Sequence, residues 1–181
     1  MNEVRYMSLG EVCSTISDTY RRNADMVTLI NTSDVLEGKV LNHKRVPNAN
    51  LKGQFKKTFQ QDDILYSEIR PQNKRFAYVD FSPVDYIAST KLMVIRARTD
   101  VVSPKYLYYF LKSDSTVSEL QMLAETRSGT FPQITFSEIA TPQETRRTMA
   151  TRMSAKPHIL NSSKSCLFAA IFSTALITQN S

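Results

Sequence analysis

The sequence predicts an α+β fold: a twisted, mixed or antiparallel β-sheet with helices packed on it, followed by a C-terminal helical tail. Three observations lead to this class. Short runs of β-branched and aromatic residues, the composition of strands, recur between residues 26 and 97. Residues 102–125 instead repeat apolar side chains at helical spacing. Strands thus precede helices, which is typical of α+β domains rather than of a regular strand–helix repeat.

The first sixty residues predict strands joined by turns. MSLGEVCSTIS (7–17) is expected as a short helix or turn with Leu9, Val12 and Ile16 on one side. MVTLI (26–30) is a β-branched run and therefore a strand, and residues 31–34 are turn and cap formers. GKVLNHKRV (38–46) is expected as a second strand or hairpin arm, and NANLKGQFKKTFQ (48–60) as a surface segment.

Three further segments up to residue 97 predict more strands. QQDDILYSEIR (60–70) alternates, so that Ile64, Tyr66 and Glu68 face one side and the residues between them face the other. Residues 71–73, Pro-Gln-Asn, stop this strand. KRFAYVDF (74–81) is another strand, and VDYIASTKLMVIRA (84–97) supplies two more.

The part that follows predicts two helices and one exit strand. Ser103 and Pro104 are start signals for a helix whose Leu107 and Leu111 recur at helical spacing, and a second helix is expected at about 116–124. The same spacing assigns the aromatic side chains of this helix mostly to the core, namely Tyr106, Tyr108, Tyr109 and Phe110. QITFSEI (133–139) is expected as a short strand.

The last forty residues differ from the rest, so we expect one domain over residues 1–141 and a tail over 142–181. PQETRRTMATRMSAK (142–156) is expected as a helix that Pro157 ends. CLFAAIFSTALIT (166–178) is an apolar run of 13 residues, too short to span a bilayer. It is expected to pack on this domain, on a partner or on a second copy.

Positive charge is concentrated in one block. The chain carries a formal net charge of +6, and residues 39–98 hold 12 lysines and arginines against five acidic residues. Aromatic residues are interleaved with them, among them Phe55, Phe59, Tyr66, Phe76 and Tyr78. Such a block can bind phosphates of nucleic acid. A solvated basic face is the alternative.

Motifs for catalysis or cofactors are missing from the sequence. It holds no GxGxxG, GxxxxGK[ST] or GxSxG pattern, and its two cysteines and two histidines are too few and too scattered for a metal cluster. A Mg²⁺-dependent nuclease would have to use Asp85, Glu68 and Lys91, which lack convincing ligand spacing. We therefore expect a binding module without cofactor or metal. The start lacks an apolar signal core, which predicts a cytoplasmic protein.

Five stretches together resemble a known family. LINTSDVLEGKVL, QQDDILYSEIRPQNKRFAYVDF, ASTKLMVIRA, SPKYLYYFLKSDS and AETRSGTFPQITFSEI resemble, in that order, the target recognition domain of type I restriction–modification specificity (S) subunits, over roughly residues 5–140. The resemblance implies a non-catalytic domain that reads one half of a split site in double-stranded DNA. It implies methyltransferase (M) subunits as partners and, through them, restriction (R) subunits.

The tail departs from the pattern of that family. Pro142-Gln143-Glu144 is similar to the start of the long heptad helix that follows such domains, but the heptads do not continue and Pro157 interrupts them. The chain therefore looks like a half-size or truncated S subunit. A homodimer through the tail is one expectation. An interaction protein of the same complex that no longer reads DNA is the rival hypothesis, and a nuclease is the third.

Two polar segments are the main candidates for contact with DNA bases. One is the loop that contains Arg127, Ser128, Gly129, Thr130 and Gln133. The other is the turn that contains Arg70, Gln72, Asn73, Lys74 and Arg75. Arg, Gln and Asn are the side chains that make bidentate base contacts, and glycine allows the backbone to approach closely. The alternatives are a tight helix-to-strand connection with Phe131 in the core, and a solvated hairpin tip.

Lysines of the basic block are the candidates for phosphate contacts. Lys52, Lys56 and Lys57 are expected to reach the DNA backbone, with an exposed face as the alternative. Lys91, at the start of an expected strand, is assigned equally to a structural or a DNA-facing role.

Overall fold

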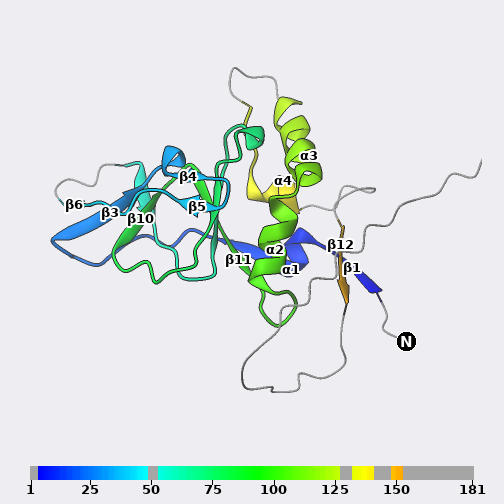
Figure 1. Cartoon of the computed structure of the whole chain (residues 1–181), viewed down its shortest axis with the longest axis horizontal. Helices are drawn as coiled ribbons and strands as arrows, with labels where there is room; N and C mark the ends of the chain where they lie inside the picture. Colours follow the sequence, from blue (N-terminus) through cyan, green and yellow to red (C-terminus); the bar gives the residue numbers. More distant parts are fainter. Residues whose placement is uncertain (1–3, 49–52, 127–131, 141–147, 153–181) are drawn as a thin grey trace, which may run out of the picture.

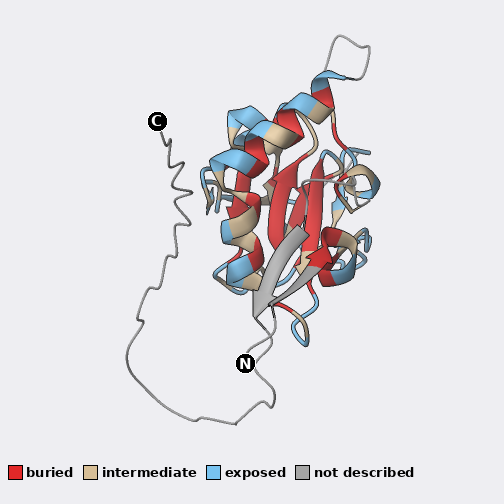
Figure 2. Cartoon of the chain, turned by 90° about the vertical axis from the view of Figure 1, so that its right-hand side faces the viewer, coloured by how far each residue is buried: buried red, intermediate tan, exposed pale blue. Residues whose placement is uncertain are grey.

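The computed structural model of the protein describes residues 4–48, 53–126, 132–140 and 148–152. It confirms the α+β class, with two four-stranded sheets and a group of helices arranged as successive layers (Figure 1). The sheet with the order β2-β11-β8-β9, called the central sheet below, lies between the other four-stranded sheet and the helices. Buried residues concentrate on its strands and on the helix faces turned toward it (Figure 2).

The central sheet is antiparallel, in the order β2-β11-β8-β9. Its strands are β2 (Cys13–Ile16), β11 (Leu92–Ala97), β8 (Ile64–Ser67) and β9 (Phe76–Tyr78). The alternation predicted for β8 is confirmed, because Ile64 and Tyr66 join the core beneath the helices while Leu65 joins the core between the two sheets. A strand buried on both faces explains why this segment is so apolar.

The second sheet is mixed, in the order β6-β3-β10-β7. Its strands are β6 (Arg45–Pro47), β3 (Met26–Ile30), β10 (Tyr86–Ser89) and β7 (Phe55–Lys57), and only β3 and β10 pair in parallel. The expectation of a surface segment over 48–60 was wrong in part. Residues 55–57 form β7, and Phe59 is 7% exposed in the core between the sheets, although Lys56 is exposed.

A small hairpin lies against the edge strand β9. Its strands are β4 (Val35–Leu36) and β5 (Lys39–Val40), and the 3-10 turn η1 (Thr32–Asp34) precedes it. Gly38, at the hairpin turn, has a φ of +103° and its N–H donates to Phe76 O at 2.9 Å. A Cβ atom at Gly38 would collide with the hydroxyl of Tyr108, so the close approach of this turn requires glycine.

Four helices cover the other face of the central sheet (Figure 1). They are α1 (Leu9–Val12), α2 (Pro104–Leu111), α3 (Asp114–Glu125) and α4 (Phe136–Ala140). The two predicted helices, α2 and α3, are confirmed. The opening helix ends at Val12, because Cys13 begins β2 and pairs with Ala97 of β11. Ile16 therefore belongs to a strand rather than to the face of α1.

The expectation of an exit strand over 133–139 was wrong. Only Gln133 makes a strand-like bridge, with Ile69, and α4 begins at Phe136. The Glu138 carboxylate accepts hydrogen bonds at 2.7 Å from both the backbone N–H and the hydroxyl of Thr135. This local capping arrangement favours a helix over a strand.

The helix expected over 142–156 was wrong for the part that the structure describes. Residues 148–152 form β12 (Thr148–Arg152), which pairs antiparallel with β1 (Val4–Ser8). Residues 142–147 and 153–181, which include the apolar run, lie outside the described residues. The domain boundary after residue 141 remains a prediction.

The expectation that the aromatic side chains of α2 lie mostly in the core was wrong for two of the four. Leu107 and Leu111 occupy its buried stripe, whereas Tyr106 and Tyr109 are 46% and 54% exposed. Tyr108 and Phe110 are half-buried against the core. A helix with a single covered side leaves part of any aromatic run in solvent.

Among the described residues no helix has the length and apolar character needed to cross a membrane.

Candidate nucleic-acid interface

The turn predicted at residues 70–75 is present in the structure. It is built around the 3-10 turn η2 (Pro71–Asn73), and the flanking Arg70 and Lys74 both adopt left-handed backbone, with φ of 45° and 51°. Such a conformation is uncommon for residues other than glycine and is frequent at binding sites. Pro71 is buried, while Gln72 and Asn73 are exposed. The turn therefore presents two neighbouring amides to solvent.

Helix α3 packs against this turn and is hydrogen-bonded to it. The Oε1 atom of Gln121 accepts the Gln72 N–H at 3.2 Å, and Gln121 Nε2 donates to Glu125 at 2.7 Å. Gln121 is only 9% exposed. The Lys74 ammonium lies 3.0 Å from the Asp114 carboxylate at the start of the same helix. Sequence reasoning missed Gln121, although a glutamine on the buried stripe of an amphipathic helix is a signal for such a contact.

The structure brings the two predicted base-contacting segments together. Ile69 and Gln133 form a β-bridge, the Arg70 N–H donates to Pro132 O at 3.1 Å, and the Ile134 N–H donates to Glu68 O at 2.8 Å. The turn η2 lies beside the end of α3 (Figure 1). Gln133 is half-buried next to it. The other candidates of that loop, Arg127, Ser128, Gly129 and Thr130, lie outside the described residues.

The β4–β5 hairpin completes this edge of the molecule. The Glu37 N–H donates to Lys74 O at 2.9 Å, and Arg75 Nη1 donates to Ser33 O at 3.2 Å. The Arg75 guanidinium thus ties η1 to β9. Lys74 and Arg75, both predicted to contact DNA, have partners within the protein. We call the surface formed by Arg70, Gln72, Asn73 and Gln133 the recognition edge.

The predicted phosphate-binding lysines have different surroundings. Lys57 Nζ donates to Thr90 O at 2.9 Å and Leu92 O at 2.8 Å, and lies 3.8 Å from Glu68. Burial lowers the pKa of Lys57, an effect that Glu68 opposes. Lys56 and Lys91 are exposed, and Lys52 lies outside the described residues. Of these four candidates, Lys56 and Lys91 therefore have side chains in solvent within the described residues.

The residues considered for a nuclease have other partners. Asp85 accepts the Tyr20 hydroxyl at 2.9 Å and lies 3.4 Å from Arg22, while Glu68 lies beside Lys57. Within the described part of the chain, no three His, Cys, Asp or Glu side chains are grouped as metal ligands. The contacts of Asp85 and Glu68 secure loops onto the second sheet.

Comparisons with known proteins give a consistent result. A family model described as "Type I restriction modification DNA specificity domain" matches residues 1–142. The specificity subunit of the type I restriction enzyme HindI from Haemophilus influenzae is 44% identical over 142 residues, which cover 77% of this chain and 31% of that protein.

Two solved structures have the same fold. The HsdS subunit from Thermoanaerobacter tengcongensis is 26% identical with a TM-score of 0.61, over 76% of this chain and 36% of that one. A chain from a study of complex assembly and conformational transition of the type I R-M system is 23% identical with a TM-score of 0.61 and the same coverage. The chain thus spans about a third of the length of these relatives.

Proposed function

We propose, from the premise that the chain belongs to the family of type I restriction–modification DNA specificity domains, that it is the DNA-reading component of such a system. In this proposal it binds one half of a bipartite site in double-stranded DNA and supplies no chemistry of its own. Its partners are the M subunits and, through them, the R subunits. It needs no cofactor and works in the cytoplasm.

One observation carries this proposal. Two polar segments that lie 60 residues apart in the sequence are joined by the Ile69–Gln133 bridge and by the hydrogen bond from Arg70 to Pro132. The N–H groups of Arg70, Gln72 and Asn73 donate hydrogen bonds within the protein, and the side-chain amides of Gln72 and Asn73 are exposed. Exposed amides on a fixed backbone suit contact with base edges in the major groove.

The candidate residues then divide into two roles. Gln72 and Asn73 contact base edges, together with the loop that contains Arg127, Ser128, Gly129, Thr130 and Gln133. Lys52, Lys56 and Lys91 contact phosphates, which fix the register of the protein on the duplex. Lys57, Lys74 and Arg75 support the framework instead, because each already has a partner in the protein.

The test is selection from a random duplex pool, with the chain alone and then with M subunits. We expect a short enriched motif, and the double substitution Gln72→Ala/Asn73→Ala should relax the preference at one or two positions of it. Each good bidentate contact contributes about 1–3 kcal/mol of discrimination. Gln61→Ala is the matched control, since Gln61 is also an exposed amide.

Either negative result would be informative. An unchanged motif in the double variant would remove Gln72 and Asn73 from base reading. No motif in either format would contradict the proposal and favour an interaction protein that no longer reads DNA.

A further inference from the structure

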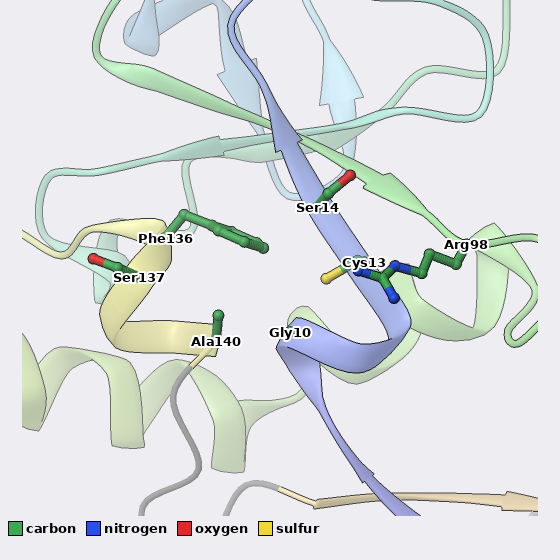
Figure 3. A pocket seen from close by; sticks show the side chains of 7 residues that line it. All are labelled: Gly10, Cys13, Ser14, Arg98, Phe136, Ser137 and Ala140. Carbon is green, nitrogen blue, oxygen red and sulfur yellow. The ribbon is translucent and has the colours of Figure 1, made fainter.

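A groove lies on the helical side of the molecule, between α1, α4 and the start of β2. Its volume is about 540 Å³, and seven residues line it, namely Gly10, Cys13, Ser14, Arg98, Phe136, Ser137 and Ala140. Figure 3 shows α4 on one side, with Phe136 and Ala140, and Cys13 and Ser14 of β2 on the other. Arg98 is the one charged residue in this lining. The groove is separate from the recognition edge.

The packing of its walls leaves the groove open. A Cβ atom at Gly10 would lie 3.2 Å from Ala140 O, so α1 and α4 touch closely at this point. Phe136 and Ser14 are only half-buried, although Phe136 packs on the main core. A partly exposed aromatic side chain beside small residues forms a surface on which an apolar segment can pack.

We propose that this groove is covered by the chain's own apolar run, residues 166–178. The run contains no charged residue, and burying its surface is favourable. Residues beyond Arg152 continue from β12, and β12 pairs with β1, the strand that leads directly into α1. The apolar run is therefore tethered to one wall of the groove.

The length of the connection permits this docking. Ser8, next to α1, pairs with Thr148, and Val4 pairs with Arg152, so β12 runs away from the groove over five residues. Five residues of strand correspond to about 16 Å. The segment 153–165 contains 13 residues, which reach at most about 43–47 Å when extended. A tether of this length gives an effective concentration on the order of millimolar, above that of a free partner at micromolar concentration.

The experiment uses Cys166, at the start of the run, as a proximity reporter in the full chain. In a Cys13→Ser background, Ser137→Cys places a thiol on the rim of the groove. Ser82→Cys places one at an equally exposed position on the loop that precedes β10 of the second sheet. Each variant is cross-linked with a short bis-maleimide, and monomeric product is followed over time on gels. Melting curves verify that both variants remain folded.

We expect the Ser137→Cys variant to form the internal cross-link at least five times faster than the Ser82→Cys variant. Equal rates in the two variants would overturn the proposal, because a docked run would hold Cys166 closer to position 137 than to position 82. Cross-linked dimers that increase with protein concentration would also overturn it and would assign the groove to a second copy. Loss of DNA binding in these variants would be evidence about the recognition edge and not about the groove. The proposed function and the proposed docking can therefore be contradicted independently.

Discussion

The recognition edge and the central sheet use polar residues in opposite ways. In the central sheet, Asp63 is fully buried and its carboxylate accepts two hydrogen bonds from the Arg96 guanidinium, at 2.7 and 2.8 Å. At the recognition edge, the N–H groups of Arg70, Gln72 and Asn73 donate within the protein, while the side-chain amides of Gln72 and Asn73 are exposed. Polar groups whose bonds close inside the protein stabilise the fold. Those left at the surface can be exchanged without loss of stability, so they are free to serve the DNA contacts proposed for this edge.

The largest expected effect comes from breaking the buried pair. Asp63→Ala should lower the free energy of unfolding by about 3 kcal/mol, because it leaves Arg96 and the Gln60 N–H without their acceptor. Asp80→Ala, which removes an exposed carboxylate, is the control. Urea unfolding curves give both values. A loss below about 1 kcal/mol for Asp63→Ala would show that this pair is not part of the framework.

The neighbouring Lys56 and Lys57 give the most direct test of the difference between polar residues with partners inside the protein and exposed polar residues. Lys57→Ala should lower the free energy of unfolding by about 1–2 kcal/mol, because two carbonyl groups lose their donor. Lys56→Ala should leave it unchanged but weaken DNA binding on all sequences and reduce the salt slope by about one. Unfolding curves and binding titrations at several salt concentrations measure both effects. Reversed results would exchange the two roles.

Much of the fold follows from the sequence because its signals are local. The alternation in residues 64–69 predicts both faces of β8, and the spacing around Leu107 and Leu111 predicts α2. The α4 helix was missed although its signal is local too. Thr135 and Glu138 have the spacing of a capping box, but the run that contains them, residues 133–139, was interpreted as a strand.

Other features depend on partners far along the chain. The pairing of β12 with β1 joins residues 140 to 148 positions apart, and no local pattern indicates it. The sequence likewise does not distinguish Lys56 from Lys57, because the carbonyl groups that accept from Lys57 come from residues 90 and 92. The side-chain types in the sequence indicated the candidate residues. Their assignment to the framework or to the exposed surface depends on contacts that form only in the folded chain.

The buried thiol of Cys13 predicts a pH dependence of stability. Burial raises its pKa from 9.0 to about 12, opposed by Arg98. The folded state therefore keeps its proton where the unfolded state loses it, and stability falls as the pH rises from about 9 to 12. In a Cys166→Ser background, the difference in unfolding free energy between Cys13 and Cys13→Ser should shift by about 1.4 kcal/mol for each pH unit in that window. A constant difference between pH 8 and 10.5 would contradict this prediction.

The smallest expected effect concerns the one buried side-chain oxygen or nitrogen that lacks a hydrogen-bond partner within the described residues, the hydroxyl of Tyr66. The ring stacks on Phe76 with centroids 5.5 Å apart and is 1% exposed, so the hydroxyl was removed from water without compensation. Tyr66→Phe keeps the ring and should therefore leave the free energy of unfolding unchanged or raise it by up to about 1 kcal/mol.

Urea unfolding measures this change, and Tyr78→Phe is the matched control because its hydroxyl donates to Asp62. A loss of more than about 1 kcal/mol for Tyr66→Phe would show that the hydroxyl has a partner, such as a buried water. In that case the buried side-chain polar groups of the central sheet that the structure describes would all have partners.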